Sequence, residues 1–182
     1  MDQVKKKISV RDMVYTALFA AVICAVAPFS IAIGPIPVSF ATLAIYLAAG
    51  ALDAKYAVLS VLLYIALGAV GLPVFSNFEG GFHKIAGISG GFIIGYLPCA
   101  LAAGIIIDVS KGKIWSYALG MAVGTFSLYT CGMAWFMFQT GSTFAVSLTL
   151  CVSPFLVGDA IKIVLACITA PKLRGALHIK NH

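Results

Sequence analysis

The stretch Pro154-Phe-Leu-Val-Gly158-Asp159-Ala-Ile-Lys162 places two opposite charges inside an apolar run. Asp159 and Lys162 are three residues apart, so in a helix they share one face. The surrounding run is too apolar to be anything but a membrane span. A charge near the bilayer centre costs about 2.5 to 3.5 kcal/mol, so ionisable residues inside a membrane usually face the protein interior and mark a functional site. The alternative is a structural ion pair that holds two helices in register.

The composition of the whole chain agrees with a membrane protein. Of its 182 residues, 62% are apolar and only 10% are charged, whereas about 25% are charged in ordinary soluble domains. The length and the long uncharged runs predict a single integral membrane domain over residues 1–182. The net charge of +6 does not indicate a nucleic-acid partner, because the basic residues stand between apolar runs and do not alternate with aromatics on a soluble face.

The cysteines and histidines do not form a recognisable metal site. The five cysteines are scattered without C-x-x-C spacing, and we interpret them as small apolar packing residues. The three histidines have no carboxylate or thiol at ligand spacing. We therefore expect neither a metal ion nor a bound cofactor.

Uncharged runs, prolines and glycines divide the chain into six predicted transmembrane helices, which makes the expected fold an all-α polytopic membrane protein. The longest run, Ile114 to Gly158, has 45 residues without a charge. As a single helix it would be about 67 Å long, twice the bilayer core, so it must contain two spans. We expect the break at Gln139-Thr140-Gly141-Ser142, the most polar tetrapeptide of the run. The approximate spans are 11–30, 38–52, 56–71, 91–108, 114–137 and 147–170.

The distribution of basic residues predicts the orientation. If the N-terminus is cytoplasmic, Lys84 lies outside, Lys162 lies within the membrane, and the other ten basic residues lie inside. This asymmetry satisfies the positive-inside rule. Both termini are then cytoplasmic (N-in/C-in), and we expect a multi-pass protein of the cell membrane. The ten are Lys5, Lys6, Lys7, Arg11, Lys55, Lys111, Lys113, Lys172, Arg174 and Lys180.

Residues 72–90 form a predicted outer loop that is rich in glycine. Glycines let the backbone adopt unusual angles or approach another group closely. The loop also contains aromatic and polar side chains, a mixture that suits a lid over a small ligand. A flexible connector is the alternative, but such linkers are rich in Ser and Gly and poor in aromatics. The side chains in question are Phe75, Asn77, Phe78, Glu79, Phe82 and Ser89.

Ala17, Ala21 and Ala25 recur every four residues in the first predicted span and form a face of small residues. Such a face lets another helix approach closely in lipid. Spacing does not tell whether the contact is internal or with another subunit, and the repeat taken alone slightly favours internal packing.

Four further features of the sequence are the motifs Gly34-Pro35-Ile36-Pro37-Val38, Leu62-Leu63-Tyr64-Ile65-Ala66-Leu67-Gly68-Ala69-Val70-Gly71-Leu72-Pro73-Val74-Phe75, Gly90-Gly91-Phe92-Ile93-Ile94-Gly95-Tyr96, and the opening stretch from Pro154 to Lys162. Together these motifs resemble the BioY family, the biotin-binding S components of energy-coupling factor (ECF) transporters. The chain departs from the family at Gly87-Ile88-Ser89, where Gly-Pro-Thr is common, and at Phe82-His83-Lys84, which interrupts the glycine-rich loop.

The resemblance implies a six-helix S component that captures biotin from outside. Its partners would be a transmembrane T component, on which the face formed by Ala17, Ala21 and Ala25 would dock, and two cytoplasmic ATPases. The chain itself has no G-x-x-x-x-G-K-[ST] motif, so it cannot couple ATP hydrolysis to transport by that mechanism.

The chemistry of biotin defines what its site needs. The molecule has a ureido ring with two N–H donors and a carbonyl acceptor, an apolar sulfur ring and a valerate carboxylate, so the pocket needs an acceptor, donors and apolar walls. By the resemblance, Asp159 accepts from a ureido N–H, Lys162 donates to the ureido carbonyl, and Asn77 donates to the carboxylate. The walls would come from Phe78, Tyr96 and the backbone at Gly90 and Gly91.

Two other classes of function are compatible with charges inside the membrane. A membrane enzyme would need an acid, base or nucleophile constellation, and the only deep ionisable residues are Asp159 and Lys162, so we expect no enzyme. A proton-coupled or stand-alone secondary carrier of biotin or a similar small vitamin could use Asp159. Such carriers commonly contain internal repeats, and none is detectable in this sequence.

Overall fold

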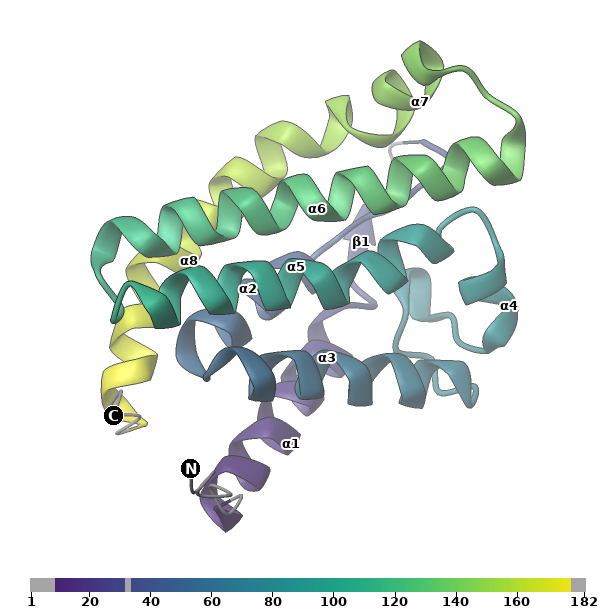
Figure 1. Cartoon of the computed structure of the whole chain (residues 1–182). Coiled ribbons are helices and arrows are strands. Elements are labelled where there is room, and N and C mark those ends of the chain that lie inside the picture. Colours follow the sequence, from purple (N-terminus) through teal and green to yellow (C-terminus); the bar gives the residue numbers. More distant parts are fainter. Residues whose placement is uncertain (1–8, 32–33, 178–182) are drawn as a thin grey trace, which may run out of the picture.

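The computed structural model describes residues 9–31 and 34–177 and is a bundle of helices, which confirms the predicted all-α class (Figure 1). The longer helices are α1 (Val10–Val26), α2 (Ala41–Ala51), α3 (Ala54–Ala69), α5 (Gly90–Val109), α6 (Ile114–Thr140) and α8 (Ser153–Ala176). The shorter elements are β1 (Ser30–Ile31), β2 (Val38–Ser39), the 3₁₀ turn η1 (Ser76–Phe78), α4 (Phe82–Ala86) and α7 (Phe144–Cys151).

Helix α6 ends at Thr140, within the polar tetrapeptide where the sequence predicted a break. Gly141 follows it in the left-handed conformation, with φ 66°, and its N–H donates to the Met137 carbonyl at 2.9 Å. Glycine adopts this conformation without the steric cost that a Cβ would add, which makes it a common helix terminator.

The region predicted as one continuous span over residues 147–170 is divided between α7 and α8. Val152 separates the two helices with φ −122° and ψ −52°, which is not helical, and Pro154 lies in the first turn of α8. Proline suits this position because N–H groups in the first turn of a helix have no intrahelical acceptor, so the N–H that proline lacks removes no hydrogen bond. The structure therefore adds a short helix, α7, that the apolar pattern did not reveal.

Helix α8 also continues beyond residue 170, through Pro171, to Ala176. Arg174 in its last turn is buried and forms ion pairs with Asp53 at 3.2 Å and Asp108 at 2.6 Å. Asp53 follows α2, and Asp108 lies near the end of α5. The guanidinium of Arg174 therefore connects α8 to both of these helices. Arg174, which lies beyond the predicted span 147–170, is thus part of the packed bundle.

The predicted outer loop has structure of its own. It contains η1 and α4, and an isolated bridge pairs Phe75 with Glu79. Nearby, β1 and β2 form a small antiparallel hairpin in which Ser30 pairs with Ser39. The sequence did not predict this hairpin, because two-residue strands leave no periodic pattern.

Helix α5 lies between α6 and α3 (Figure 1). Its contact with α6 depends on glycine: a Cβ at Gly120 would meet the Ala103 carbonyl, and a Cβ at Gly124 would meet the Cys99 carbonyl. Small residues of this kind let two helix backbones approach closely, as in membrane helix pairs.

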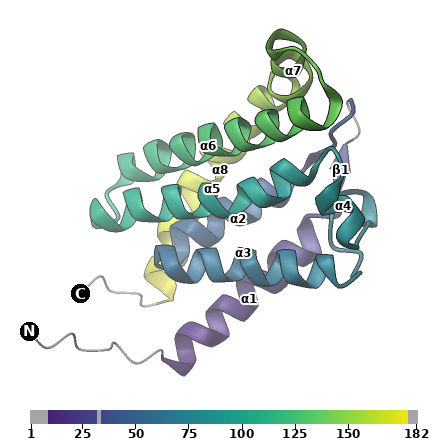
Figure 2. The same ribbon diagram turned by 45° about the vertical axis from the view of Figure 1, so that its right-hand side comes forward.

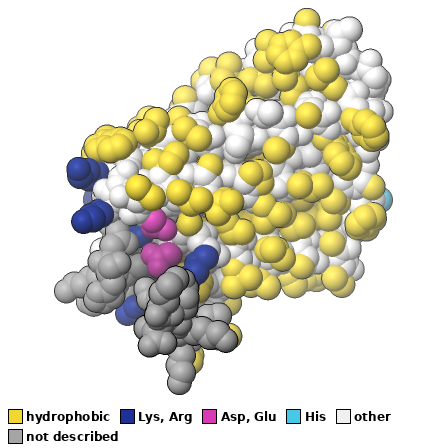
Figure 3. Space-filling model, viewed as in Figure 1, with side chains coloured by type: hydrophobic (Ala, Val, Ile, Leu, Met, Phe, Trp, Pro, Cys, Tyr) yellow, Lys and Arg dark blue, Asp and Glu magenta, His cyan; other side chains and the backbone are white. Residues whose placement is uncertain are grey.

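In the described part of the chain, three helices are long and apolar enough to cross a membrane, namely α5, α6 and α8. Helices α2 and α3 are apolar but shorter, with 11 and 16 residues. The surface in Figure 3 is broadly hydrophobic, and its charged side chains gather at one end of the molecule. This pattern is that of a membrane protein.

The charged end is the end where α1 begins and α8 finishes, whereas β1, α4 and α7 lie at the opposite end (Figure 2). Exposed basic side chains also lie at this end, next to the helices that Arg174 connects. They are Lys55 at the start of α3, Lys111 and Lys113 between α5 and α6, and Lys172 near the end of α8.

Candidate functional site

A cavity of about 600 Å³, counting the part open to the outside, lies between the helices and reaches toward the end that carries α4. Side chains from α2, α3, α4, α5, α6 and α8 contribute to it. The lining residues are Ile36, Pro37, Ser39, Thr42, Tyr64, Phe75, Ser76, Lys84, Ser89, Phe92, Ile93, Tyr96, Leu128, Tyr129, Phe155, Asp159 and Lys162.

The buried ion pair of α8 lies at one side of this cavity, which we call the floor. Lys162 Nζ and Asp159 Oδ1 are 3.0 Å apart, and the two residues are only 6% and 2% exposed. Their spacing of three residues brings both onto the same helix face, as the sequence predicted. Because each charge offsets the other, the floor is strongly polar but carries no net charge.

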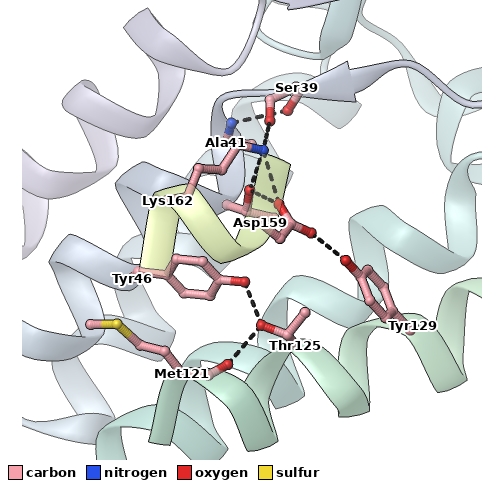
Figure 4. Close-up of polar contacts among 9 residues, drawn as sticks. Ser39, Ala41, Tyr46, Met121, Thr125, Tyr129, Asp159 and Lys162 are labelled. Carbon is pink, nitrogen blue, oxygen red and sulfur yellow. Dashed lines mark hydrogen bonds and ion pairs between the residues drawn. The ribbon is translucent and has the colours of Figure 1, made fainter. Parts of the chain in front are cut away.

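Neutral groups from three other elements complete the floor (Figure 4). Lys162 donates to the Ser39 carbonyl at 2.7 Å and to the Thr42 hydroxyl at 2.9 Å, in addition to Asp159. All three ammonium N–H groups therefore have acceptors. Asp159 accepts from Thr42 at 3.2 Å and from the Tyr129 hydroxyl at 2.7 Å.

This count of hydrogen bonds determines what the floor offers a ligand. An ionised carboxylate has about four lone-pair sites, and the Asp159 carboxylate uses three of them for Lys162, Thr42 and Tyr129. It can accept one more N–H without losing a protein contact. Lys162 can donate to a ligand only by releasing Thr42 or the Ser39 carbonyl.

A second buried polar chain lies beside the floor (Figure 4). Thr125 donates its hydroxyl hydrogen to the Met121 carbonyl at 2.7 Å, so Tyr46 must be the donor in its hydrogen bond with Thr125. Because these buried hydroxyls are satisfied within the protein, they fix the positions of α2 and α6 around the cavity.

The remaining walls are mainly aromatic. Phe92 and Phe155 are stacked with ring centroids 5.8 Å apart, and Tyr129 meets Phe155 edge to face. On another wall, Tyr64 meets Phe75 edge to face at 5.5 Å. Apolar walls around a small polar floor suit a ligand whose polar head is attached to an apolar ring.

The structure brings three of the predicted ligand residues into the cavity: Asp159, Lys162 and Tyr96. It does not bring Asn77 or Phe78 there. The Asn77 side chain points toward the hairpin, where its Oδ1 accepts from Ser30 at 2.7 Å, and Phe78 is 59% exposed beside Phe29.

Both residues have positive φ, 63° at Asn77 and 57° at Phe78, so the chain turns sharply at this point. This turn, which residue types alone do not reveal, directs the two side chains away from the cavity. Their contact with a ligand stays a prediction, and it would require the loop to rearrange.

Gly90 and Gly91 are also outside the lining. A Cβ on Gly90 would collide with the Ile85 carbonyl of α4, and a Cβ on Gly91 would collide with the Trp135 side chain and the Cys131 carbonyl of α6. The two glycines therefore let the start of α5 pack closely against α4 and α6, beside the wall that Phe92 contributes. A direct contact between their backbone and a ligand stays a prediction.

Several lining residues were missed by the sequence analysis. Thr42 and Tyr129 each stand in an apolar run, and single hydroxyls are common in such runs, so only the packing reveals that they meet Asp159. In the sequence, nothing distinguishes Phe155 from the other apolar residues near the charged pair. Lys84 lies in a segment that departs from the family pattern, and nothing else in the sequence indicates that it lines the cavity.

The alanine face of α1 lies on the exposed side of that helix. Ala17, Ala21 and Ala25 are all exposed, whereas Thr16, Phe19, Ala20 and Ile23 form the buried side. The internal packing that the repeat alone slightly favoured is therefore wrong for this chain. The face is free for a contact outside the described residues.

The part of the chain that the structure describes holds no cluster of three or more His, Cys, Asp or Glu that could bind a metal ion. The polar chemistry of the cavity comes from an ion pair, hydroxyls and one further lysine. Such a set can hold and orient a ligand by hydrogen bonds.

Comparisons with known proteins agree on one family. The family model described as "BioY family" matches residues 2–179. The chain is 32% identical to "Biotin transporter BioY" of Thermotoga maritima over 164 residues, covering 90% of this chain and 96% of that protein. It is 34% identical to "Probable biotin transporter BioY" of Pyrococcus horikoshii over 165 residues, covering 91% and 97%.

A solved structure has the same fold. It is the crystal structure of the S-component for biotin from an ECF-type ABC transporter. The two structures superpose with a TM-score of 0.83 at 26% sequence identity, covering 96% of this chain and 95% of the other.

Proposed function

Because this chain belongs to the BioY family, we propose that it binds biotin from outside the cell and serves in biotin uptake as the S component of an ATP-driven ECF-type transporter. The family membership that the sequence motifs indicated is confirmed. Relatives named as biotin transporters and the likeness to a biotin S-component support the substrate and the role.

The observation that carries the proposal is the floor of the cavity. Asp159 has capacity for one further N–H, which a ureido ring supplies, and Lys162 is a cationic donor 3.0 Å from the same carboxylate. In this proposal, Lys162 releases Thr42 or the Ser39 carbonyl and donates to the ureido oxygen. The stacked rings of Phe92 and Phe155 then cover the apolar sulfur ring.

The membrane arrangement belongs to the same proposal. Six spans with both termini in the cytoplasm would put the charged end of Figure 3 inside and α4 with its loop outside. The basic residues support this orientation by the positive-inside rule. The location is then the cell membrane, and biotin would reach the cavity from the outer side.

The energising partners follow from the role of an S component. A transmembrane T component and two cytoplasmic ATPases would supply the driving force, and the exposed face of Ala17, Ala21 and Ala25 offers a surface for close helix contact. Membership of a transporter family supports a transport role in place of an enzymatic one. Biotin is then a transported substrate and not a cofactor.

The test is a titration of biotin into the detergent-purified chain, with lipoic acid as the matched control. Lipoic acid also has a five-membered sulfur ring and a valerate tail, but it lacks the ureido group. The proposal expects biotin to bind and lipoic acid to bind far more weakly. Equal affinity for both compounds would show that the floor does not recognise a ureido head.

A second measurement addresses the secondary-carrier alternative. Biotin uptake by cells that contain all subunits should stop when ATP is depleted and continue when the proton gradient alone is collapsed. The opposite pattern would assign the chain to the proton-coupled class.

A further inference from the structure

Lys84 is the second basic side chain of the cavity. Among the described residues that line it, only Lys84 and Lys162 carry a positive charge. Lys162 lies at the floor with its three N–H groups in use. Lys84 comes from α4, in the outer segment, and its side chain is 23% exposed. The cavity thus has a neutral polar floor and a cation contributed by its outer segment.

Lys84 is held in place by one acidic neighbour. Its Nζ is 2.8 Å from Glu79 Oε2, and the Glu79 side chain is 42% exposed and does not line the cavity. The backbone of Glu79 is fixed in turn, because its carbonyl accepts from the Phe75 N–H at 2.8 Å. An ammonium group has three N–H donors, and Glu79 accounts for one, so Lys84 has capacity for a second carboxylate.

Biotin, the proposed ligand, requires a donor for its carboxylate. Biotin carries a carboxylate at the end opposite its ureido ring, and an anion that leaves water needs a cationic or hydrogen-bonding partner. The floor does not provide this partner, because Lys162 already uses its three N–H groups and its counter-charge Asp159 is buried, whereas Glu79, the counter-charge of Lys84, is partly exposed. Asn77, for which the sequence predicted this role, is directed toward Ser30.

We propose that Lys84 is the residue that binds the carboxylate tail of the ligand and that Glu79 is its partner when the cavity is empty. This assignment rests on the proposed function and names the group that recognises the charged end of the substrate. Arrival of the ligand carboxylate gives Lys84 two acidic neighbours, so Glu79 competes with the ligand for the ammonium group.

Because Glu79 would compete with the ligand, substitutions of Lys84 and Glu79 distinguish a binding role of Lys84 from a merely structural role. If the ion pair only shapes the loop, Lys84→Gln and Glu79→Gln both break it and affect every ligand in the same way. If Lys84 binds the tail, the two variants have opposite effects on the preference for a charged tail. Lys84→Gln removes the attraction, whereas Glu79→Gln removes a competitor.

The experiment compares biotin with biotinamide, whose tail is neutral, in calorimetric titrations of the detergent-purified chain. The wild type should prefer biotin by roughly tenfold, the effect expected for a charge-assisted hydrogen bond at a partly exposed site. Lys84→Gln should bring the ratio near one by weakening biotin binding alone. Glu79→Gln should raise the ratio, and Lys84→Arg should keep the wild-type preference.

Lys111→Gln, an exposed lysine at the charged end, is the matched control and should leave the ratio unchanged. A wild-type preference that persists in Lys84→Gln would overturn the assignment while leaving the proposed function intact. Failure of the wild type to bind either compound would instead overturn the proposed function, and the assignment with it.

Discussion

Thr42 of α2 and Asp159 of α8, 117 positions apart in the sequence, are joined by a hydrogen bond of 3.2 Å at the floor of the cavity. The same hydroxyl accepts from Lys162 at 2.9 Å. A neutral side chain thus contacts both members of the buried ion pair, and it is one of the groups that Lys162 could release to a ligand.

Thr42→Val keeps the shape of the side chain but removes the hydroxyl. One N–H of Lys162 and one lone pair of Asp159 then lose their partner, which should lower the free energy of unfolding by about 1 to 3 kcal/mol. Because Lys162 gains a free donor, added biotin should raise the apparent melting temperature of the variant by more than that of the wild type.

Thermal unfolding followed by tryptophan fluorescence measures both effects. Thr149→Val is the control, since Thr149 is exposed on α7 and its hydroxyl bonds only to the Ala145 carbonyl of its own helix. Equal melting temperatures for the two variants would contradict the role assigned to Thr42.

Asp159→Asn should weaken biotin binding. The amide keeps the size of the side chain but offers fewer acceptor sites and leaves Lys162 without its counter-charge, a change worth about 1 to 3 kcal/mol in affinity, or roughly 5- to 150-fold in Kd. Titration of biotin into the purified variant measures it. A purely structural ion pair would lower the yield of folded protein and leave the affinity of the surviving protein as in the wild type.

Arg174→Met should destabilise the bundle without affecting biotin. The change leaves Asp53 and Asp108 without their shared guanidinium at the end opposite α4. Loss of a partner from a fully buried pair costs about 3 to 5 kcal/mol, and the partial exposure of both acids reduces this to roughly 1 to 3 kcal/mol. Lys172→Met, on the exposed side of the same turn, should change neither property.

The measurement again combines thermal unfolding with biotin titration. A variant that keeps its melting temperature but loses affinity would place Arg174 in communication with the cavity and contradict its purely structural role.

Ala21→Trp should block assembly with the other transporter subunits while leaving biotin binding intact. Ala21 is exposed at the centre of the alanine face of α1, and an indole there would hold a docking helix away from the backbone. Co-purification with the tagged T component measures assembly. Ala66→Trp, the same change at an exposed position of α3, is the control, and normal recovery of the Ala21 variant would exclude the face as a docking surface.

Cysteine labelling should reveal which end of the bundle is outside. In a background without native cysteines, His83→Cys should react with an impermeant maleimide added to intact cells, because His83 is exposed on α4. Lys111→Cys should react only after permeabilisation. Labelling of the Lys111 variant from outside would reverse the proposed orientation.

The sequence was sufficient for those parts of the molecule that depend on strong local signals. Charges inside an apolar run are conspicuous, so Asp159 and Lys162 could be identified and placed on one helix face. The end of α6 could be predicted because Gly141 lies in a polar tetrapeptide. In each case the physical cause is contained within a few neighbouring residues.

The parts that the sequence did not reveal depend on contacts between distant segments. Thr42 and Tyr129 reach Asp159 only because α2, α6 and α8 meet. Asn77 has the right chemistry for a carboxylate, but the positive φ at this residue turns it toward Ser30. The break at Val152 was hidden because hydropathy does not distinguish one apolar helix from two short ones.

The offset charges on the floor of the cavity have an electrical consequence. Moving one elementary charge through the membrane potential changes its energy by about 2.3 kcal/mol per 100 mV, an amount comparable to a good contact in a binding site. Asp159 and Lys162, 3.0 Å apart, form a neutral unit, and a ureido head is neutral as well. The voltage across the membrane therefore does no net work on the floor or on the ureido head, and any effect of the voltage on binding of the proposed ligand acts through its charged carboxylate tail.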